Sequence, residues 1–520
     1  MADRVWQWTG RTADQLRAAL RLTNEAFAEH LGVSARSVAD WRRKPDMVPM
    51  NVAQQVLDTA LEQAPEDVRR QFHEATGTGS SPTIEPSLGG AHRLVEDPHI
   101  GRALEWLDQA ATWSAGQARA KVAAQLAELD SQALHDRGQR RAQVSQQQLV
   151  WALASYYGDA PEGYGRYGAR IGDTETATTV LTSAEWLDLA APLLGAADRL
   201  AVTTAPAPEP ALDDSAAEQA VARLAEALTV NVQLVDMPLY RLDSTDVCAG
   251  SIGGQLGVDR FARYALTTDL LEAETVDALA DNRPVAPGQL PLRDRYLPDF
   301  GAVLDVSNRL CAGGTLALCA IARPASLLRP RPDYVLMIQE RSGRVLNAAR
   351  RLAVIPKGFH QPMTDYRTDA QLGATLLREM EEELFGRSDI DNTIAEDRHA
   401  DPMHPSRLSA PMRGLAESNA LRIECTGFGY NLISGNYEFP GLIVIDDEQF
   451  WTEHGGALEA NWEASGLRQV STLDRDQVAE LAGEIAWSNE GLFAYLQGLR
   501  RLAQLGGERV DLPAIEWELW

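Results

Sequence analysis

The sequence predicts a multidomain protein of the α and α/β classes. An all-α bundle comes first, a central mixed α/β region follows, and the C-terminal α/β region has a mixed sheet. A chain of 520 residues is too long for one ordinary hydrophobic core. The first 75 residues show helical periodicity alone, whereas strand-like runs dominate after residue 310. The expected divisions are a helical domain (1–75), a linker (76–95), a helical segment (96–143), a mixed region (144–305) and a C-terminal domain (306–520).

The overall composition is that of a globular protein, with 45% hydrophobic and 23% charged residues. No apolar run reaches the roughly 18–20 residues that a membrane helix needs. The opening segment, "MADRVWQWTG", lacks the apolar region of a secretory signal. The four cysteines have no CxxC spacing, which argues against a zinc ribbon or a disulfide framework. We therefore expect a cytoplasmic protein with no membrane partner.

The chain is strongly acidic, with 48 Lys and Arg against 74 Asp and Glu, a net charge of −26. Such a surface repels nucleic acid at long range. Ionic screening limits this repulsion to about 8–10 Å in physiological salt. Between Arg11 and Lys44 the balance reverses, with seven basic and four acidic residues. A small module in this segment can therefore still bind DNA.

The segment "RTADQLRAALRLTNEAFAEHLGVSARSVADWRRKP" predicts three short helices. Thr12 with Gln15 predicts a capping box at the start of the first helix. Thr23 can cap the second helix, Gly32 supplies a tight turn, and Ser34 can cap the third. The expected inward-facing residues are Leu16, Leu20, Phe27, Leu31, Val38 and Trp41.

This pattern resembles the helix-turn-helix of the Cro/repressor-like (XRE) family over roughly residues 10–62. The resemblance implies that the third helix enters the major groove of double-stranded DNA, where a homodimer would read two half-sites. The residues expected to contact bases are Arg36, Ser37 and Asp40, at the N-terminal part of that helix. The other residues of the expected DNA-binding set are Asn24, Ser34, Arg42, Arg43 and Lys44. The sequence departs from the family at Asn24, where Gln is usual, and at Lys44-Pro45, where Gly is usual. A three-helix bundle that binds a protein remains the alternative.

The middle of the chain is less informative. "TGTGSSPTIEPSLGG" (76–90) is the clearest linker, and "TAPAPEPALDD" (204–214) is a second Pro-rich break. Val122, Leu126, Leu129 and Ala133 repeat with 4-3-4 spacing, so segment 96–143 predicts a helical seam that pairs with a second copy or packs within its own domain. The aromatic loop "YYGDAPEGYGRYG" can line a pocket or simply pack.

The segment "LREMEEELFG" (377–386) concentrates carboxylates after one arginine. On a helix Glu379, Glu382 and Glu383 fall at i, i+3 and i+4 and share one face. Mg²⁺, a hard divalent cation, prefers oxygen ligands and bridges to phosphates, and Arg378 can hold a carboxylate in place. The sequence therefore predicts a site for Mg²⁺ or Mn²⁺ at these three glutamates. The alternative is a solvated acidic helix face.

This segment resembles the Nudix box, Gx5Ex7REUxEExGU, in which U is aliphatic. Residues 378–383 match REUxEE, and Gly358 stands in the place of the first glycine. The resemblance spans roughly residues 312–503 and implies an α/β/α sandwich with a mixed sheet. It implies metal binding by Glu379, Glu382 and Glu383, with Glu382 and Glu383 catalytic in an active enzyme. It further implies ligand binding by Gly358 and Arg378.

The sequence also departs from this box. Nineteen residues separate Gly358 from Arg378 where the family has thirteen, the upstream glutamate falls at Ala370 beside Asp369, and Phe385 fills the glycine position. The favoured hypothesis is a DNA-binding transcriptional regulator whose Nudix-like domain senses a nucleotide or nucleoside diphosphate. The first alternative is a Mg²⁺-dependent Nudix hydrolase with an accessory helix-turn-helix. The second alternative is a protein-interaction scaffold in a stress or defence assembly.

Overall fold

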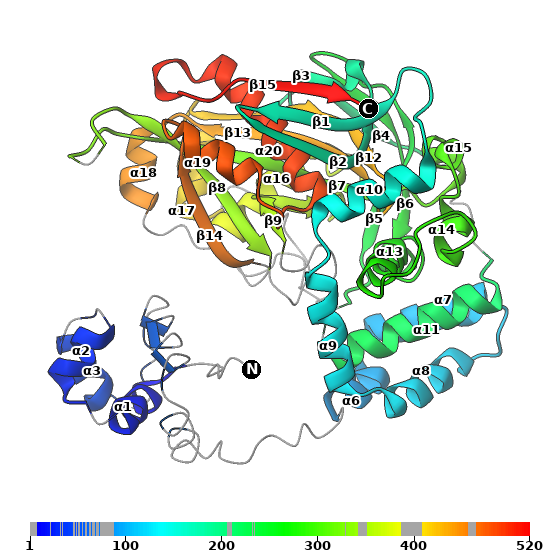
Figure 1. The fold of residues 1–520 in the computed structure, drawn as a ribbon, viewed down its shortest axis with the longest axis horizontal. Coiled ribbons are helices and arrows are strands. Elements are labelled where there is room, and N and C mark those ends of the chain that lie inside the picture. The colour runs from blue at the N-terminus through cyan, green and yellow to red at the C-terminus, as the bar shows by residue number, and fades with distance from the viewer. Residues whose placement is uncertain are drawn as a thin grey trace. The chain divides into compact units, whose positions relative to one another are not determined.

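The computed structural model describes residues 8–20, 22–31, 33, 35–44, 88–204, 211–230, 232, 234–327, 329–341, 351–363, 365–385, 408–455 and 464–520, with scattered positions between 47 and 72. The fold is mixed α/β (Figure 1). It divides into two compact units, Met1–Leu88 and Gly89–Trp520.

The first unit contains helices α1 (Gly10–Ala19), α2 (Asn24–Leu31) and α3 (Ala35–Arg43). The capping box of α1 pairs Thr9 with Thr12, so the predicted pair of Thr12 and Gln15 was wrong because the helix starts three residues earlier. The Thr23 cap is confirmed, since its Oγ1 accepts from the amide of Ala26 at 3.2 Å. The expected turn at Gly32 lies outside the described residues.

The core of the first unit forms where the apolar periodicity predicted it. Leu16, Phe27, Leu31, Val38 and Trp41 are buried together, and Trp8 and Phe72 pack in the same cluster. Gly10 brings the start of α1 against the end of α3. A Cβ at this position would lie 2.3 Å from the carbonyl oxygen of Trp41 and 2.4 Å from that of Lys44. The close contact of the two backbones therefore requires glycine.

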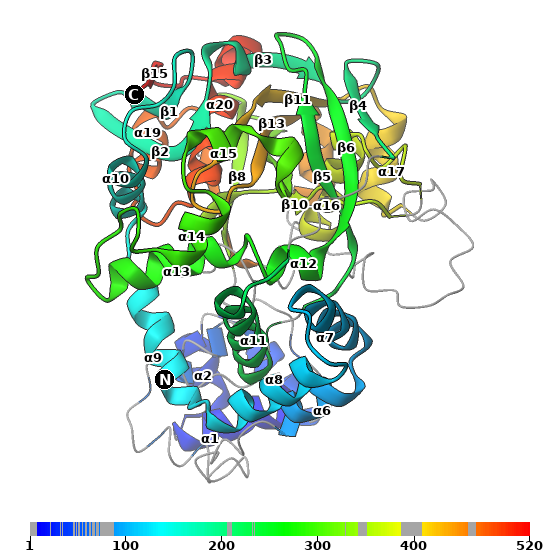
Figure 2. The ribbon, with the colours of Figure 1, turned by 90° about the vertical axis from the view of Figure 1, so that its right-hand side faces the viewer.

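Within the second unit, one group of helices gathers beside the sheets (Figure 2). It comprises α6 (Leu88–Glu96), α7 (Pro98–Ala110), α8 (Gln117–Glu128), α9 (Ser131–Ala142) and α11 (Asp214–Thr229). The predicted seam is not continuous, because Leu129 is extended (φ −71°, ψ 128°) and separates α8 from α9. Val122 and Leu126 are buried, while Ala133 is exposed. The first half of the seam thus packs inside its own unit, where α8 contacts α11.

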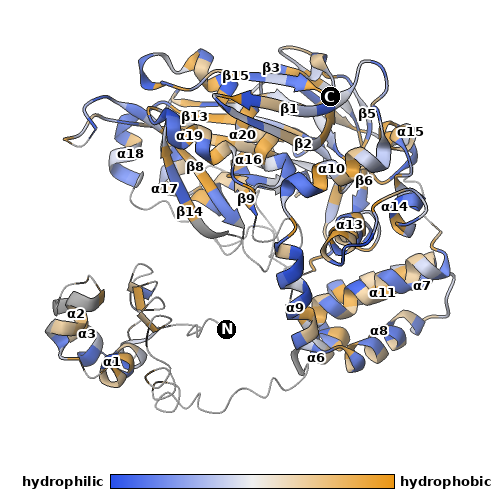
Figure 3. Ribbon diagram, in the orientation of Figure 1, coloured by the Kyte–Doolittle hydropathy of each residue, from blue (hydrophilic) through white to orange (hydrophobic). Residues whose placement is uncertain are grey.

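Helix α9 is held by charge rather than by apolar packing. It has no buried residue, and Figure 3 shows it as hydrophilic. Arg137 pairs with Glu226 of α11, and Nε and Nη2 of Arg141 both donate to the carboxylate of Asp277. Because Asp277 belongs to α13 (Leu270–Ala280), α9 connects the helical group to the helices that pack on the sheets.

A large mixed sheet of twelve described strands organises the second unit. The strand order is β14-β8-β7-β13-β12-β2-β1-β15, with β9, β10, β11 and β3 attached at its sides. β7 and β13 pair in parallel, and the other pairs are antiparallel. The strands are β1 (Gly165–Ile171), β2 (Thr174–Thr182), β3 (Leu187–Pro192), β7 (Gly313–Arg323), β8 (Asp333–Arg341), β9 (Leu352–Val354), β10 (Lys357–Phe359), β11 (Leu421–Gly427), β12 (Gly429–Asn431), β13 (Tyr437–Ile445), β14 (Ala464–Ser471) and β15 (Ile515–Leu519).

The expected boundary at residue 305 does not divide two sheets. β1, β2 and β3 come from the expected central region, yet they pair with β15, β12 and β11 of the large sheet. A second sheet of three strands contains β4 (Asp198–Val202), β6 (Ile252–Arg260) and β5 (Pro238–Thr245), with β5 and β6 side by side in Figure 2. Residues 144–305 therefore fold together with the residues that follow them.

Helices cover both faces of the large sheet. Ala317 and Cys319 of β7 pack in one core cluster with Leu376 and Met380. The alternate residues Leu316 and Leu318 belong to a second cluster with the apolar side of α20, as expected because successive side chains of a strand point to opposite faces. The remaining helices of this unit are α10 (Gln146–Tyr157), η1 (Ala184–Trp186), α12 (Phe261–Ala265), α14 (Pro291–Tyr296), α15 (Phe300–Leu304), η2 (Val306–Asn308), α16 (Leu372–Glu379), η3 (Met380–Leu384), α17 (Ala410–Glu417), α18 (Glu448–His454), α19 (Arg475–Ala482), α20 (Asn489–Leu505) and η6 (Gly507–Arg509).

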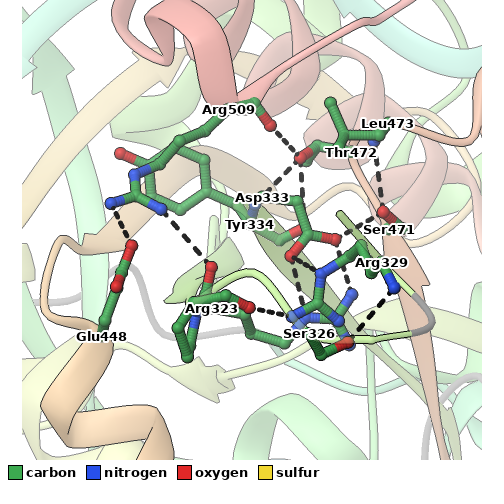
Figure 4. A network of polar contacts seen from close by, with 11 residues as sticks. Arg323, Ser326, Arg329, Asp333, Tyr334, Glu448, Ser471, Thr472, Leu473 and Arg509 are labelled. Atoms are coloured by element: carbon green, nitrogen blue, oxygen red, sulfur yellow. Dashed lines mark hydrogen bonds and ion pairs between the residues drawn. The ribbon is translucent and has the colours of Figure 1, made fainter. Parts of the chain in front are cut away.

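A polar network joins several elements at one end of this sheet (Figure 4). Asp333, at the start of β8, has no exposed surface. Its carboxylate accepts from Arg323 at 3.0 and 2.6 Å, from Ser471 of β14, and lies 3.0 Å from Nε of Arg329. Arg509 extends the network by pairing with Glu448 at 2.7 Å. Two guanidinium groups thus neutralise one buried carboxylate.

No helix of the described residues is long and apolar enough to cross a membrane. All four cysteines are free thiols. Cys248 is exposed, and the other three are buried. These thiols agree with the expected lack of a disulfide framework.

Candidate functional site

Two parts of the chain carry the residues that the sequence singled out. In the first unit, the end of α3 presents exposed basic side chains. Arg42 and Arg43 close the helix, and Lys44 follows it. Asn24 begins α2 and is half-buried, as is Ser37 in α3. The sequence therefore located this exposed basic run.

The remaining expected base-contacting positions are not fully described. Arg36 and Asp40 belong to α3, but their side chains lie outside the described part of the chain, as does all of Ser34. The helical phase of α3 is nevertheless defined by its buried side. Val38 and Trp41 are both only 3% exposed.

In the second unit, the acidic motif starts on a helix that is held by both sheets. Asp198 of β4 accepts from the amide of Leu372 at 2.7 Å and thereby caps α16 from another part of the fold. Burial raises the pKa of Asp198 to about 6, against the lowering effect of this amide bond. A Cβ on Gly373 would lie 2.2 Å from the carbonyl oxygen of Leu193, so the first turn of α16 rests on the chain that follows β3.

The motif itself is not a regular α-helix. After Glu379 the chain continues as a π-helical segment over Met380–Leu384. Extra residues per turn alter the i, i+3, i+4 spacing on which a single carboxylate face depends. The alternative of a solvated acidic face does not hold, because Glu379, Glu382 and Glu383 are between 1% and 8% exposed. The motif is an interior element.

Gly358 and Arg378 meet at Glu379. A Cβ on Gly358 would lie 2.1 Å from Oε1 of Glu379, so glycine is the residue that lets this carboxylate lie against β10. Nη2 of Arg378 donates to the same oxygen at 3.0 Å. Arg378 is 3% exposed and also approaches the carbonyls of Phe359 and Gln361, both at 3.4 Å. The arginine thus anchors Glu379 and the strand together.

The neighbouring glutamates have different partners. Oε2 of Glu383 accepts from the amide of Lys357 at 2.7 Å. Oε1 of Glu381 accepts from the amide of Ser409 at 2.7 Å, on the other side of the segment. Glu382 is 5% exposed. Main-chain amides therefore bond to one oxygen of each of two buried carboxylates, Glu383 and Glu381.

The side chain of Lys357 enters a second acidic group, which the sequence did not predict. Nζ of Lys357 lies 2.6 Å from Oε1 of Glu490, at the start of α20. The other oxygen of Glu490 accepts from Asn431 at 3.1 Å. Glu438 of β13 and Glu272 of α13 lie within electrostatic range of this pair. We call Lys357, Glu490, Glu438 and Glu272 the lysine–glutamate group.

The protonation of this group is uneven. Burial alone would raise the pKa of Glu490, but the ammonium of Lys357 outweighs it and lowers that pKa. Burial and then the charge of Glu490 raise the pKa of Glu438 well above its usual range. Burial, with Glu490 and Asp269, raises the pKa of Glu272 to about 7. The three carboxyls therefore differ in their affinity for a proton, with Glu490 shifted toward the ionised form and Glu438 and Glu272 toward the protonated form.

These residues come from four elements, which explains why sequence inspection missed them. β10, α13, β13 and α20 each contribute one side chain. The one local signal was the position of Lys357 beside Gly358. Asp369, the neighbour of the missing box glutamate, instead closes a loop by accepting from the amides of Met363 at 2.8 Å and Asp365 at 3.0 Å. Gly386 lies outside the described residues.

The acidic residues do not form a ready set of metal ligands. Among the described side chains, no group of three or more His, Cys, Asp or Glu is arranged to hold a metal ion. Glu379 turns toward Arg378, and Glu383 turns toward the amide of Lys357. The geometry that we describe thus does not fit Mg²⁺ or Mn²⁺ without rearrangement, and we derive no chemical step through either ion.

No protein-family model and no curated protein matches the chain.

Proposed function

We propose that this chain is a DNA-binding transcriptional regulator. The first unit, with its helix-turn-helix resemblance, binds double-stranded DNA as a homodimer. The second unit, with its Nudix-like resemblance, senses a nucleotide or nucleoside diphosphate. Ligand binding shifts the population of dimer geometries and thereby changes DNA affinity.

One observation carries the DNA-binding part of this proposal. Arg42, Arg43 and Lys44 are exposed together at the end of α3, in a chain whose net charge is −26. Phosphate contacts by Lys and Arg supply most of the non-specific affinity for DNA. Exposed basic residues at the end of a helix whose other side is buried give the acidic chain a surface that suits the phosphate backbone.

The sensing part is supported by how the acidic motif is used. Arg378 donates to Glu379, and the amide of Lys357 donates to Glu383. These bonds fix both carboxylates beside β10. Lys357 and Arg378 supply positive charge beside Gly358. Cationic side chains of this kind suit a phosphate-bearing ligand. Carboxylates already engaged by an arginine and a main-chain amide favour binding over turnover.

The DNA-binding part is tested by selecting genomic fragments with the full chain at near-physiological salt and sequencing them. We expect a shared palindromic site, because a dimer reads two half-sites. Arg42→Ala should lower affinity for all sequences and reduce the salt slope by about 1. Arg36→Ala should instead relax specificity at one base position. Arg283→Ala, which removes an exposed arginine from the second unit, is the matched control and should change neither quantity.

No enrichment over bulk DNA by a folded chain would refute the regulator. If Arg42→Ala leaves the salt dependence of DNA affinity unchanged, Arg42 at the end of α3 does not contact phosphates.

A Nudix-type hydrolase is the second candidate. It is favoured by the close approach of the Glu379 carboxylate to the backbone at Gly358. Its test is phosphate release from a panel of nucleoside diphosphate derivatives with Mg²⁺ or Mn²⁺. Glu382→Gln, which keeps the side-chain volume, should abolish release if Glu382 is catalytic. Release by the unmodified chain that Glu382→Gln leaves intact would assign the activity elsewhere. No release from any compound would exclude hydrolysis of that panel.

A further inference from the structure

A cleft of about 270 Å³ lies in the second unit and is lined in part by Tyr164 of the aromatic loop. Five segments of the second unit form it. They are the loop before β1, η1, the end of β5, the turn between α15 and η2, and β12. Asp305 and Ser307 are exposed at its rim, so the cleft is open to solvent. Its volume suits a small molecule rather than a protein segment.

Three aromatic rings line the cleft at steep angles to one another. Trp186 lies 5.4 Å from Tyr164 with an angle of 66° between the rings, and 5.8 Å from Tyr430 with an angle of 80°. Behind it, Phe428 packs edge-on against Trp186 at 4.8 Å and fixes the indole. Rings held at such angles present π faces and edges around a common space.

The polar lining is mostly oxygen. Asp243 and Asp305 contribute carboxylates, Ser244, Thr245 and Ser307 contribute hydroxyls, and the aromatic residues add two phenol hydroxyls and the indole N–H of Trp186. The lining contains no lysine, arginine or histidine. Acceptors therefore outnumber donors, and a phosphate or a carboxylate ligand would meet like charge.

Two buried arginines contact lining residues or their supports and hold the wall of the cleft in place. Arg241 is 1% exposed and lies 3.0 Å from Oδ1 of Asp243. Arg309 lies 5.8 Å from the ring centre of Tyr430 and donates to the carbonyls of Gly435 and Val303. Tyr430 thus already interacts with one cation. Trp186 and Tyr164 are the rings left to interact with a second.

We propose that this cleft binds a small organic cation with an alkylammonium group, against Trp186 and Tyr164 and near Asp305. An ammonium over an aromatic face is attracted by the ring quadrupole, most strongly by Trp. The carboxylate of Asp305 is free to add Coulomb attraction at the rim, where it also accepts from Ser307 at 3.1 Å and from Asn308 at 2.9 Å. This site is independent of the proposed nucleotide site.

Calorimetric titration of the full chain with choline tests the proposal. The paired titrant is the uncharged isostere of choline, in which a tert-butyl group replaces the trimethylammonium group. Both titrations use the same concentration of sodium chloride. We expect choline to bind about tenfold more tightly than the isostere, because the cation–π attraction acts on the charge and not on the shape. Equal affinities, or no binding of choline, would overturn the proposal without any variant.

Variants locate the site. Asp305→Asn and Tyr164→Leu should each weaken choline binding severalfold to about tenfold. Glu128→Gln removes an exposed carboxylate from the end of α8 and should leave the affinity unchanged. Thermal unfolding of each variant shows whether it folds. If Asp305→Asn binds choline as well as Glu128→Gln does, the cation binds elsewhere and the assignment of the cleft is wrong.

Discussion

Single side chains show how burial separates groups of identical chemistry. Glu490 and Glu272 belong to the same lysine–glutamate group, yet their pKa values shift in opposite directions. Glu490 contacts the ammonium of Lys357 directly, whereas Glu272 is within range of two other carboxylates, Glu490 and Asp269. The difference lies in the partner within contact distance, because a nearby opposite charge can offset desolvation.

The raised pKa of Glu272 predicts a stability that depends on pH. The folded chain holds a proton on Glu272 up to about pH 7, whereas the unfolded chain releases it at an ordinary glutamate pKa. Stability from this residue is therefore present at low pH and is lost as pH rises through the folded value. Glu272→Gln should remove this loss of stability. Between about pH 5 and pH 8 the free energy of unfolding of the variant should rise by on the order of 1–2 kcal/mol relative to the wild type, a figure reduced for the partial exposure of the side chain.

Urea unfolding at several pH values measures this difference. Parallel profiles for the two proteins would show that Glu272 does not carry the proton.

At the residue scale, the sequence predicted that Arg378 can hold a carboxylate in place, and Arg378 does donate to Glu379. The sequence did not predict the close approach of Glu379 to Gly358. It did not predict Lys357 with Glu490, because those two residues are 133 positions apart and neither belongs to a motif. A lysine beside a glycine is common at the end of a strand and does not by itself indicate a site. Only the fold shows that Lys357 pairs with Glu490.

At the scale of elements, the backbones of α1 and α3 lie in close contact at Gly10. Gly10→Ala would place a Cβ 2.3 Å from one main-chain oxygen and 2.4 Å from another. Relieving this clash requires the backbone to shift, which costs more free energy than moving a side chain. We expect the first unit to lose about 1–3 kcal/mol of stability and the chain to lose DNA affinity. The matched change is Gly138→Ala in α9, where no neighbouring atom lies within 4 Å. It should stabilise its unit by up to about 1 kcal/mol.

Hydrogen exchange resolved by segment distinguishes these effects. Faster exchange in residues 10–44 alone is expected for Gly10→Ala. Unchanged exchange there would show that α1 can shift away from α3 at little cost.

The network around Asp333 predicts a sharp contrast between two ion pairs. Asp333→Ala leaves Arg323 and Arg329 without the buried carboxylate that neutralises them, and breaking such a pair costs about 3 kcal/mol or more. Glu516→Ala breaks the pair with Arg170 on β1, whose side chains are 67% and 58% exposed. That pair should contribute far less, because solvent screens it. Denaturant unfolding of both variants gives the comparison, and similar costs would contradict the role assigned to burial.

At the element scale, the sequence predicted local structure better than continuity. The apolar periodicity of α1 to α3 predicted which side of each helix is buried, and the structure buries that side. The 4-3-4 spacing of Val122 to Ala133 failed because Asp130 caps a new helix after an extended Leu129. The regular helix expected for the acidic motif failed at Met380, where the backbone widens into a π turn. Caps and backbone defects depend on contacts that periodicity does not record.

For the molecule as a whole, charge is divided unequally between the two units. Residues 1–88 contain ten Lys and Arg against twelve Asp and Glu, so nearly all of the net charge of −26 belongs to residues 89–520. The large unit therefore repels DNA while the small unit is almost neutral. Affinity for DNA should depend on the few basic residues of the first unit.

If the second unit senses a ligand that controls DNA binding, the coupling must be reciprocal. A nucleotide that changes DNA affinity by a given factor must have its own affinity changed by the same factor when DNA is bound. With ADP as the probe and the selected DNA site as the partner, we expect a factor of about 5–150 in both titrations. Binding of ADP with the same affinity in the presence and absence of DNA would refute sensing by this nucleotide.

The composition of the large sheet was beyond sequence inspection. The parallel pairing of β7 with β13 brings Gly313 beside Tyr437, and β3 joins through β11. Strand-like runs indicate that a sheet exists, but they do not say which strands are neighbours, because pairing depends on the packing of both faces. The division at residue 305 failed for this reason.

The pairing of β1 with β15 has a consequence for biosynthesis. Arg170 and Glu516 face each other in this pair and are 346 positions apart in the chain. At about 5–20 residues per second, a ribosome needs roughly 20–70 s to supply the second strand after the first. Throughout that interval the edge of β1 is an open template for a strand of another chain. Molecules made close together on one messenger RNA are thus exposed to wrong pairing, and a holding chaperone acting on this one edge would protect the yield of folded protein.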